Sequence, residues 1–386
     1  MVLARCARLF LPLLLTASLV VALWPGSARA DVLGPSVVRV ERLSSGEFVY
    51  LVNEEVEYMV GMGYNAIYRF LPDEERAARY NQDFSRMVAL GINTILGWDA
   101  DKGFEQDKWD ELTLDKAWEH GIGVVMPFYL PPEGNYEDAA FREQLKAELA
   151  AKVVRYRDHP ALRMWGIGNE VIEGVTASGQ VDVFGSLYLE LADIAHELDP
   201  NHPVIYREAE DVYLPLLSWY RPDDGVERPW LLYGMNFYTY RLEEALANWP
   251  LLSNGMPLFV TEFAPEGCAG EDRVVGYLKM WEMIRSHPDF VLGGAPYVWT
   301  TDGPEPVDRE YGLVDGDGNP VDGSLEAMSG EFLLTSAGGG PSLLQRAKLR
   351  TYLSLVFGME WTSVGARKPR PGAGRVVAAI LHRELI

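Results

Sequence analysis

Between residue 59 and about residue 300, short apolar runs alternate with amphipathic stretches, and this alternation limits the fold more than any other feature of the chain. Eight strands are predicted in this region, at residues 59–64, 92–97, 122–129, 162–168, 203–207, 231–237, 257–261 and 290–298. Most of these runs are continuously apolar, which is typical of strands that are buried on both faces of a parallel sheet.

The stretches between the runs carry apolar residues at three- and four-residue spacing, which predicts helices. The clearest helices cover residues 80–90, 108–120, 139–158, 184–198 and 271–286. Gly91 and Gly121 stand just past two of the helix ends, where glycine is favoured. Eight strands with intervening helices predict an α/β fold, a closed (β/α)8 TIM barrel that forms a single catalytic domain over residues 31–337.

Three further segments flank the predicted barrel. A short N-terminal hairpin is expected over residues 37–52, at the bottom of the barrel, and a second hairpin is expected around the Asp-Gly turns of residues 315–318. A last helix is expected to begin at Ser324. Residues 338–386 combine a Gly-Gly-Gly-Pro break with many basic residues, which predicts a poorly ordered basic C-terminal tail.

Residues 1–30 have the composition of a secretory signal peptide. Arg5 and Arg8 precede an apolar run, and Ala28-Arg29-Ala30 has the small residues of a cleavage site. We therefore expect a secreted or periplasmic protein with no membrane segment after cleavage. Of the two cysteines, Cys6 would leave with the signal peptide, so that Cys268 would have no partner within the mature chain.

The formal net charge of −22 argues against binding to nucleic acid, which requires clustered Lys and Arg. The histidines lack the spacing of metal ligands, and the chain has no glycine-rich phosphate loop. We therefore expect no metal and no cofactor. The oligomeric state is left open.

Two of the predicted strands end in a glutamate. Glu170 follows the run Leu162–Asn169, and Glu262 follows the run of residues 257–261. The two residues are 92 positions apart. A barrel uses about 31 residues for each strand–helix unit, so this spacing separates the glutamates by about three units. They are therefore predicted on strands four and seven, facing each other at the C-terminal mouth of the barrel.

Two facing carboxyl groups are what glycoside hydrolysis requires. One must be protonated to assist the departing oxygen, and the other must be ionised to attack the anomeric carbon or to direct water. Either glutamate alone would be an ordinary polar strand end, whereas both at this spacing indicate catalysis.

These segments resemble the large clan of retaining (β/α)8 glycoside hydrolases, notably families 2 and 5. Residues 158–170, which end in Gly-Asn-Glu, resemble the acid/base strand, and Thr261-Glu262-Phe263 is similar to the nucleophile strand. The segments 234–238, 297–299 and 312–320 resemble strand six, strand eight and the hairpin that follows it. The resemblance covers roughly residues 48–330 by this count of segments.

The resemblance implies roles for individual residues. Glu170 would be the general acid/base and Glu262 the nucleophile, with retention of the anomeric configuration. Asn169 would bind the 2-hydroxyl of the sugar, and Tyr238 would donate a hydrogen bond to Glu262. Trp299 would form a floor for the sugar ring.

The end of the second strand departs from the clan pattern, because it lacks the arginine that many members carry there. Trp98 occupies this strand end and is expected to line the sugar site. Asn236 and Tyr64, at the ends of the sixth and first strands, complete the set of expected substrate-binding residues.

The sequence thus predicts a retaining glycosidase that cleaves β-linked oligo- or polysaccharides. A transglycosylase using the same residues and a non-catalytic carbohydrate-binding barrel are the open alternatives. Acidic residues in the loops at the predicted barrel mouth, such as Glu133 and Glu305, disfavour an anionic sugar of the uronic type.

Overall fold

The structure is a computed structural model that describes residues 34–65, 70–98, 109–210, 226–253, 255–336, 360–362 and 365–367. The predicted signal peptide lies outside the described residues, as does most of the predicted basic tail. Within that tail, β12 (Glu360–Thr362) and β13 (Gly365–Arg367) pair as antiparallel strands.

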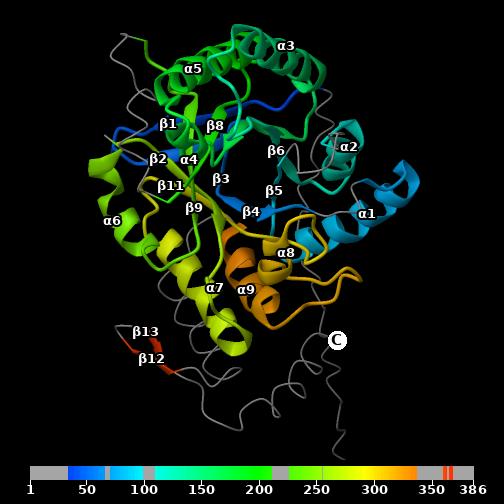
Figure 1. The fold of residues 1–386 in the computed structure, drawn as a ribbon. Helices are drawn as coiled ribbons and strands as arrows, with labels where there is room; N and C mark the ends of the chain where they lie inside the picture. The colour runs from blue at the N-terminus through cyan, green and yellow to red at the C-terminus, as the bar shows by residue number, and fades with distance from the viewer. Residues whose placement is uncertain are drawn as a thin grey trace, which may run out of the picture. The chain divides into compact units, whose positions relative to one another are not determined.

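Eight parallel strands form a closed barrel, as predicted (Figure 1). In chain order they are β4 (Met59–Gly63), β5 (Thr94–Leu96), β6 (Gly123–Phe128), β7 (Leu162–Asn169), β8 (Val204–Ala209), β9 (Leu231–Phe237), β10 (Leu258–Phe263) and β11 (Val291–Pro296). The barrel closes where β11 pairs with β4. Almost every strand residue is buried, because side chains fill the interior of the barrel and helices cover its outside.

Nine helices are found in the described part of the chain. They are α1 (Asp73–Ala89), α2 (Glu111–Glu119), α3 (Ala139–Tyr156), α4 (Ile172–Ala177), α5 (Val181–Leu198), α6 (Leu242–Leu252), α7 (Gly270–Arg285), α8 (Pro306–Tyr311) and α9 (Ser324–Ser336). The five predicted helices and the last helix at Ser324 are confirmed, whereas α4, α6 and α8 were not predicted. In these parts of the chain, no helix is both long and apolar enough to cross a membrane.

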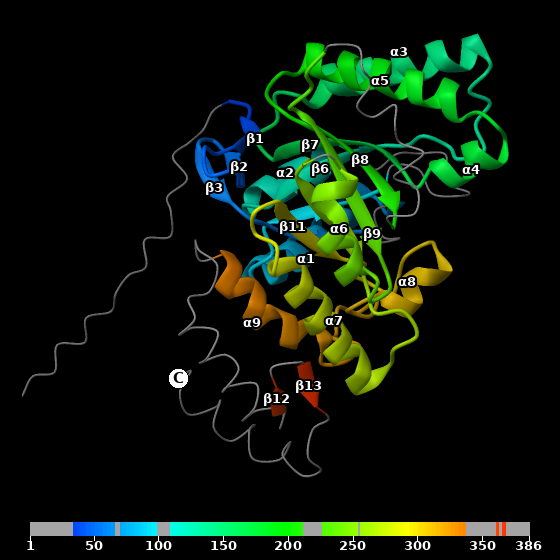
Figure 2. The same cartoon turned by 90° about the vertical axis from the view of Figure 1, so that its left-hand side faces the viewer.

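The predicted N-terminal hairpin is formed by β1 (Val38–Arg42) and β2 (Phe48–Val52), and β3 (Glu55–Glu57) extends it to a three-stranded sheet. Side chains of this sheet join a layer inside the barrel to which all eight barrel strands contribute: Val38, Tyr50, Val52, Met59, Leu96, Val125, Met164, Ile205, Leu232, Phe259, Leu292 and Ala295. Figure 2 shows the small sheet at one end of the barrel and α4 and α8 at the other. The sheet therefore closes the bottom of the barrel.

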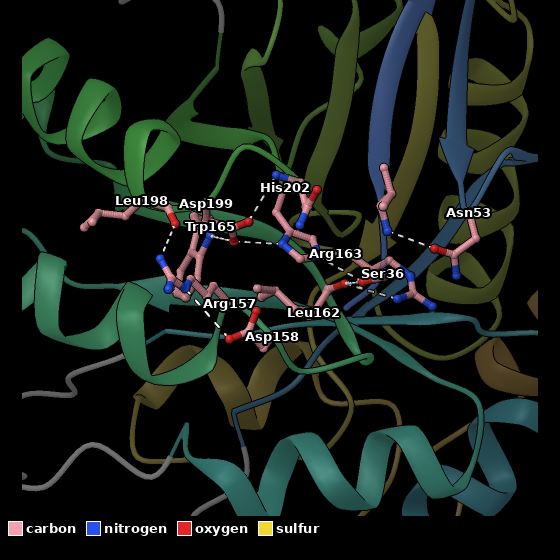
Figure 3. Close-up of polar contacts among 12 residues, drawn as sticks. Ser36, Asn53, Arg157, Asp158, Leu162, Arg163, Trp165, Leu198, Asp199 and His202 are labelled. Atoms are coloured by element: carbon pink, nitrogen blue, oxygen red, sulfur yellow. Dashed lines mark hydrogen bonds and ion pairs between the residues drawn. The ribbon is translucent and has the colours of Figure 1, made fainter. Parts of the chain in front are cut away.

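A buried chain of polar contacts attaches the start of this sheet to the barrel (Figure 3). Ser36 donates a short hydrogen bond to the Leu162 carbonyl, and its Oγ lies 2.9 Å from Nε2 of His202. The Nδ1 atom of His202 is 2.7 Å from Oδ2 of Asp199, which also accepts a hydrogen bond of 2.8 Å from Trp165 Nε1. All four polar side chains are buried, and none of them lines the cavity at the other end of the barrel. This serine–histidine–aspartate arrangement therefore stabilises the barrel bottom.

The expected second hairpin, after the last barrel strand, is present in a minimal form. Val314 and Pro320 form an isolated antiparallel bridge, and the amide of Val321 donates a hydrogen bond of 3.0 Å to the Leu313 carbonyl, but neither side extends into a strand. The Asp315 side chain instead accepts hydrogen bonds from the backbone amides of Asp317 and Asn319, which hold the segment as a tight turn.

The contacts of Ser36 predict that the Ser36→Ala variant lowers the free energy of unfolding by about 1–2 kcal/mol, because His202 would keep a buried ring nitrogen without its partner. Urea unfolding measures the change. The matched control is Ser45→Ala, in the exposed hairpin turn, which should alter stability little. Equal stability of the two variants would contradict the proposed attachment.

Candidate active site

A cavity of about 690 Å³ opens at the C-terminal ends of the barrel strands. Every wall comes from a strand end or the loop that follows it, the usual place for barrel active sites. The lining residues are Asn65, Trp98, Tyr129, Pro132, Asn169, Glu170, Ala209, Glu210, Asn236, Tyr238, Glu262, Glu266, Tyr297, Glu305, Val307 and Tyr311. Among the described residues, no group of His, Cys, Asp or Glu has the arrangement of a metal site.

The two predicted glutamates both line this cavity. Glu170 directly follows β7, the fourth barrel strand, and Glu262 lies in β10, the seventh. Glu170 has a backbone φ of 51°, in the left-handed region that residues other than glycine rarely adopt. Such strain is often found at functional sites, where the surrounding structure imposes it.

Asn236 of β9 connects the two glutamate-bearing strands. Its Oδ1 accepts a hydrogen bond of 2.8 Å from Thr261, the residue before Glu262. Its Nδ2 donates to Glu170 Oε1 at 2.8 Å and to Asn169 Oδ1 at 3.2 Å. Because the threonine hydroxyl fixes the amide orientation, the donor group of Asn236 is directed at the Glu170 carboxyl.

Glu262 is 3% exposed, and its two oxygens have different surroundings. Oε2 accepts a hydrogen bond of 2.5 Å from the phenol of Tyr238, the contact that the resemblance implied. Oε1 is buried and accepts no hydrogen bond from the described residues. One oxygen is therefore held in place, while the other remains available to a bound molecule.

The positive charge near the carboxyl pair comes from Arg207, in the middle of the barrel. Arg207 belongs to β8, is 2% exposed and donates a hydrogen bond of 3.1 Å to the Gly97 carbonyl. Gly234 on the next strand makes room for it, since a Cβ there would lie 3.0 Å from Arg207 Cγ and 2.7 Å from the Thr261 side chain. The sequence lacks the arginine that the clan resemblance implied at the end of the second strand, and Arg207 of the fifth strand, which was not predicted, supplies positive charge near the pair.

Burial raises the pKa of both catalytic candidates, and it raises that of Glu262 to about 8. The negative charge of Glu170 contributes to this rise of the Glu262 pKa, while the Tyr238 hydrogen bond, the Arg207 charge and the side-chain contact of Trp98 oppose it. Two such close carboxyl groups resist the loss of a second proton. The pair therefore retains a proton at neutral pH, and the Tyr238 donor favours negative charge on Glu262.

Aromatic side chains form another part of the cavity wall. Trp98 lines the cavity as expected and packs edge-on against Tyr297, with ring centroids 5.2 Å apart. Tyr297, which was not predicted, also contacts Tyr238 and donates a hydrogen bond of 2.9 Å to the buried Asp308. Asp308 in turn accepts a hydrogen bond from the backbone amide of Glu305. Tyr297 thus links the last strand end to the start of α8.

The expected places of Trp299 and Tyr64 in the sugar site are corrected by the structure. Both side chains are buried, and neither lines the cavity. Tyr64 packs against α1 and donates a hydrogen bond of 2.8 Å to Asp83, while the Trp299 ring lies 5.8 Å from the Arg86 guanidinium of the same helix. Strand β11 ends at Pro296, so strand alternation does not extend to residue 299.

The fold is similar to the barrel parts of several solved glycosidases. A family 2 β-galacturonidase from Eisenbergiella tayi, bound to galacturonate, superposes with a TM-score of 0.57 at 19% identity, over 77% of this chain and 54% of that one. A β-glucuronidase from Ruminococcus gnavus gives 0.57 at 17% identity, over 77% and 53%. A β-glucuronidase from Parabacteroides merdae gives 0.54 at 16% identity, over 76% and 39%.

The aligned region therefore spans about half or less of the length of these neighbours, and at such identities the likeness is one of fold. No family description and no curated protein sequence matches this chain. The (β/α)8 barrel is thus established by the structure and its neighbours together.

The raised pKa of Glu262 predicts a pH-dependent cost to stability. Glu170 and Glu262 share the retained proton, and the folded protein holds it more tightly than the unfolded chain does, so stability falls as the pH rises from about 4.5 to about 8. The Glu262→Gln variant removes one of the two repelling carboxyl groups, so its free energy of unfolding should lie about 1–3 kcal/mol above that of the native protein at the upper end of this pH range.

Urea unfolding of both proteins at about pH 5 and about pH 8 measures this difference, which should widen with pH. Glu244→Gln, at an exposed position of α6, is the control and should show no such widening. A difference that stays constant with pH would contradict the raised pKa.

Proposed function

We propose that this protein is a retaining β-glycoside hydrolase. The observation that carries the proposal is the pair Glu170 and Glu262, two carboxyl groups that line one cavity and have different hydrogen-bond partners. Different surroundings allow one group to serve as an acid while the other acts as an anion. The similarity in fold to family 2 glycosidases supports this proposal.

Glu262 is proposed as the nucleophile. Its unpartnered Oε1 attacks the anomeric carbon while the bond to the leaving oxygen breaks, which forms a covalent glycosyl–enzyme intermediate. The phenol of Tyr238 holds the other oxygen, and the buried guanidinium of Arg207 favours the ionised carboxylate that the attack requires.

Glu170 is proposed as the general acid and base. It gives its proton to the leaving oxygen in the first step and takes a proton from water in the second, when that water attacks the anomeric carbon and releases Glu262. Burial raises its pKa, which suits a group that must be protonated when the substrate arrives. Asn169, beside it in the cavity, is the proposed partner of the sugar 2-hydroxyl.

The proposal predicts that Glu262→Ala lowers kcat on 4-nitrophenyl β-glycosides by about 10³-fold or more, and that added azide restores turnover with inversion at the anomeric carbon. Glu170→Ala should also respond to azide, but its product should be the β-glycosyl azide. Polarimetry or NMR of the products distinguishes the two outcomes.

Glu244→Ala, at an exposed position of α6 away from the cavity lining, serves as the control variant. Full activity of Glu262→Ala would refute the assignment of the nucleophile. Binding of oligosaccharides by the native protein without any turnover would instead support a non-catalytic barrel, and oligosaccharide products longer than the substrate would indicate transglycosylation.

We also propose that the glycone carries no carboxylate. Glu210, Glu266 and Glu305 line the cavity in addition to the catalytic pair, and the described lining contains no Lys, Arg or His. Of these three, Glu210 is paired with Arg241 at 2.7 Å. A uronate would therefore meet an excess of negative charge.

This proposal predicts that aryl β-glucosides, β-galactosides or β-mannosides are cleaved with kcat/KM values at least about 100-fold above those of the matching β-glucuronide and β-galacturonide. The double variant Glu266→Gln with Glu305→Gln should reduce this ratio of kcat/KM values, while Glu244→Gln should leave the ratio unchanged. Uronides cleaved as fast as the neutral glycosides would overturn the charge argument and leave the glycosidase proposal intact.

A further inference from the structure

Glu208 is a buried carboxyl group that lies close to the proposed active site but does not line its cavity. It belongs to β8 and is 1% exposed. Neighbouring residues of a strand point to opposite faces, so Arg207 faces the carboxyl pair while Tyr206 and Glu208 face outward. The ring of Tyr206 packs edge-on against Tyr188 of α5, with centroids 5.0 Å apart, which confirms this outward direction.

Three hydrogen-bond donors converge on the Glu208 carboxyl. The phenol of Tyr206 donates to Oε2 at 2.5 Å, and the backbone amide of Ile172 donates to the same oxygen at 3.1 Å. The backbone amide of Ala209 donates to Oε1 at 2.9 Å. A carboxylate is suited to this place because it accepts several hydrogen bonds and donates none.

The contact with Ile172 holds the turn that carries Glu170. Ile172 is the first residue of α4, and Val171 before it supplies no side-chain cap for that helix. Glu208 therefore provides the acceptor that a capping residue would normally provide. On the other side of the turn, the backbone amide of Glu170 donates to the Arg207 carbonyl at 3.0 Å. Two hydrogen bonds to β8 thus enclose a residue with left-handed backbone geometry.

We propose that Glu208 is a positioning residue, which holds the Glu170 turn against β8 so that the Glu170 carboxyl keeps its place at the leaving oxygen. This inference rests on the proposed function, because it assigns a supporting residue to the same acid/base group. Glu208 acts through the backbone of Ile172 and has no contact with the cavity.

Electrostatics support a link between the two carboxyl groups. Burial raises the pKa of Glu208 to about 7, and the charge of Glu170 contributes to the rise. The Tyr206 hydrogen bond and the two backbone amides oppose it. An apolar side chain at this position would avoid the desolvation cost of a buried carboxyl group, but it could not accept these hydrogen bonds.

The test uses leaving groups of different acidity. A 2,4-dinitrophenyl glycoside departs without help from an acid, whereas a phenyl glycoside depends on it. The Glu208→Ala variant should lose about 30-fold or more in kcat/KM on the phenyl β-glycoside and less than about 3-fold on the dinitrophenyl β-glycoside of the same sugar. Glu208→Gln, which keeps an acceptor oxygen, should recover part of the loss.

The sugar is the one that the native protein cleaves fastest in the glycoside comparison. Glu197→Ala, at an exposed position of α5, is the control and should alter neither substrate. Equal losses on both substrates would show a general structural effect and would overturn the proposal, as would no loss on either.

Hydrogen exchange gives a readout that does not depend on turnover. Amides of residues 171–177 should exchange about 10-fold faster in Glu208→Ala than in the native protein or in Glu197→Ala. Unchanged exchange would overturn the positioning role even if the protein is an active glycosidase. Faster exchange in a protein that cleaves no glycoside would refute the proposed function and leave the role of Glu208 in holding the turn.

Discussion

Repulsion between two carboxyl groups, both held largely out of water in one cavity, governs the chemistry of this barrel. Burial and proximity raise the pKa of Glu262 and resist full ionisation of the pair. The surrounding residues lower the pKa of the two carboxyl groups through different contacts. A phenol and a guanidinium favour charge on Glu262, while an asparagine amide contacts Glu170. That difference suits two chemically identical side chains to the different roles that we propose for them.

Strand β8 contributes to this balance from both of its faces. Arg207 extends into the barrel and supplies the positive charge, and Glu208 on the opposite face receives the backbone of the Glu170 turn. The same strand also accepts the Glu170 amide through its own carbonyl. One strand therefore affects both the charge of the pair and the geometry of one member, although neither residue lines the cavity.

The two ends of the barrel divide stability and function between them. At the bottom, an apolar layer and the Ser36–His202–Asp199 contacts are buried. At the top lie the left-handed backbone of Glu170, the buried carboxyl groups and the cavity. The neighbours in structure share this frame and are uronidases by name.

The sequence by itself determined the barrel and its two glutamates. Continuous apolar runs at regular spacing predict buried parallel strands, and the positions of Glu170 and Glu262 within that rhythm place them on strands four and seven. Asn169, Asn236, Tyr238 and Trp98 were also predicted and line the cavity. Their places at one cavity follow from strand order and strand ends, which a linear pattern contains, while the roles assigned to them stay predictions.

Only the tertiary structure decided which side chains enter the cavity where regular strands end. Trp299 and Tyr64 pack toward α1, and Tyr297 takes part in the wall instead, because strand alternation no longer applies beyond Pro296 in β11 and beyond Gly63 in β4. The place of Arg207 depends on the space above Gly234, and the contact of Glu208 depends on a turn 36 residues earlier in the chain. Such contacts join segments that are far apart in the chain and meet only when the barrel closes, so local sequence patterns do not predict them.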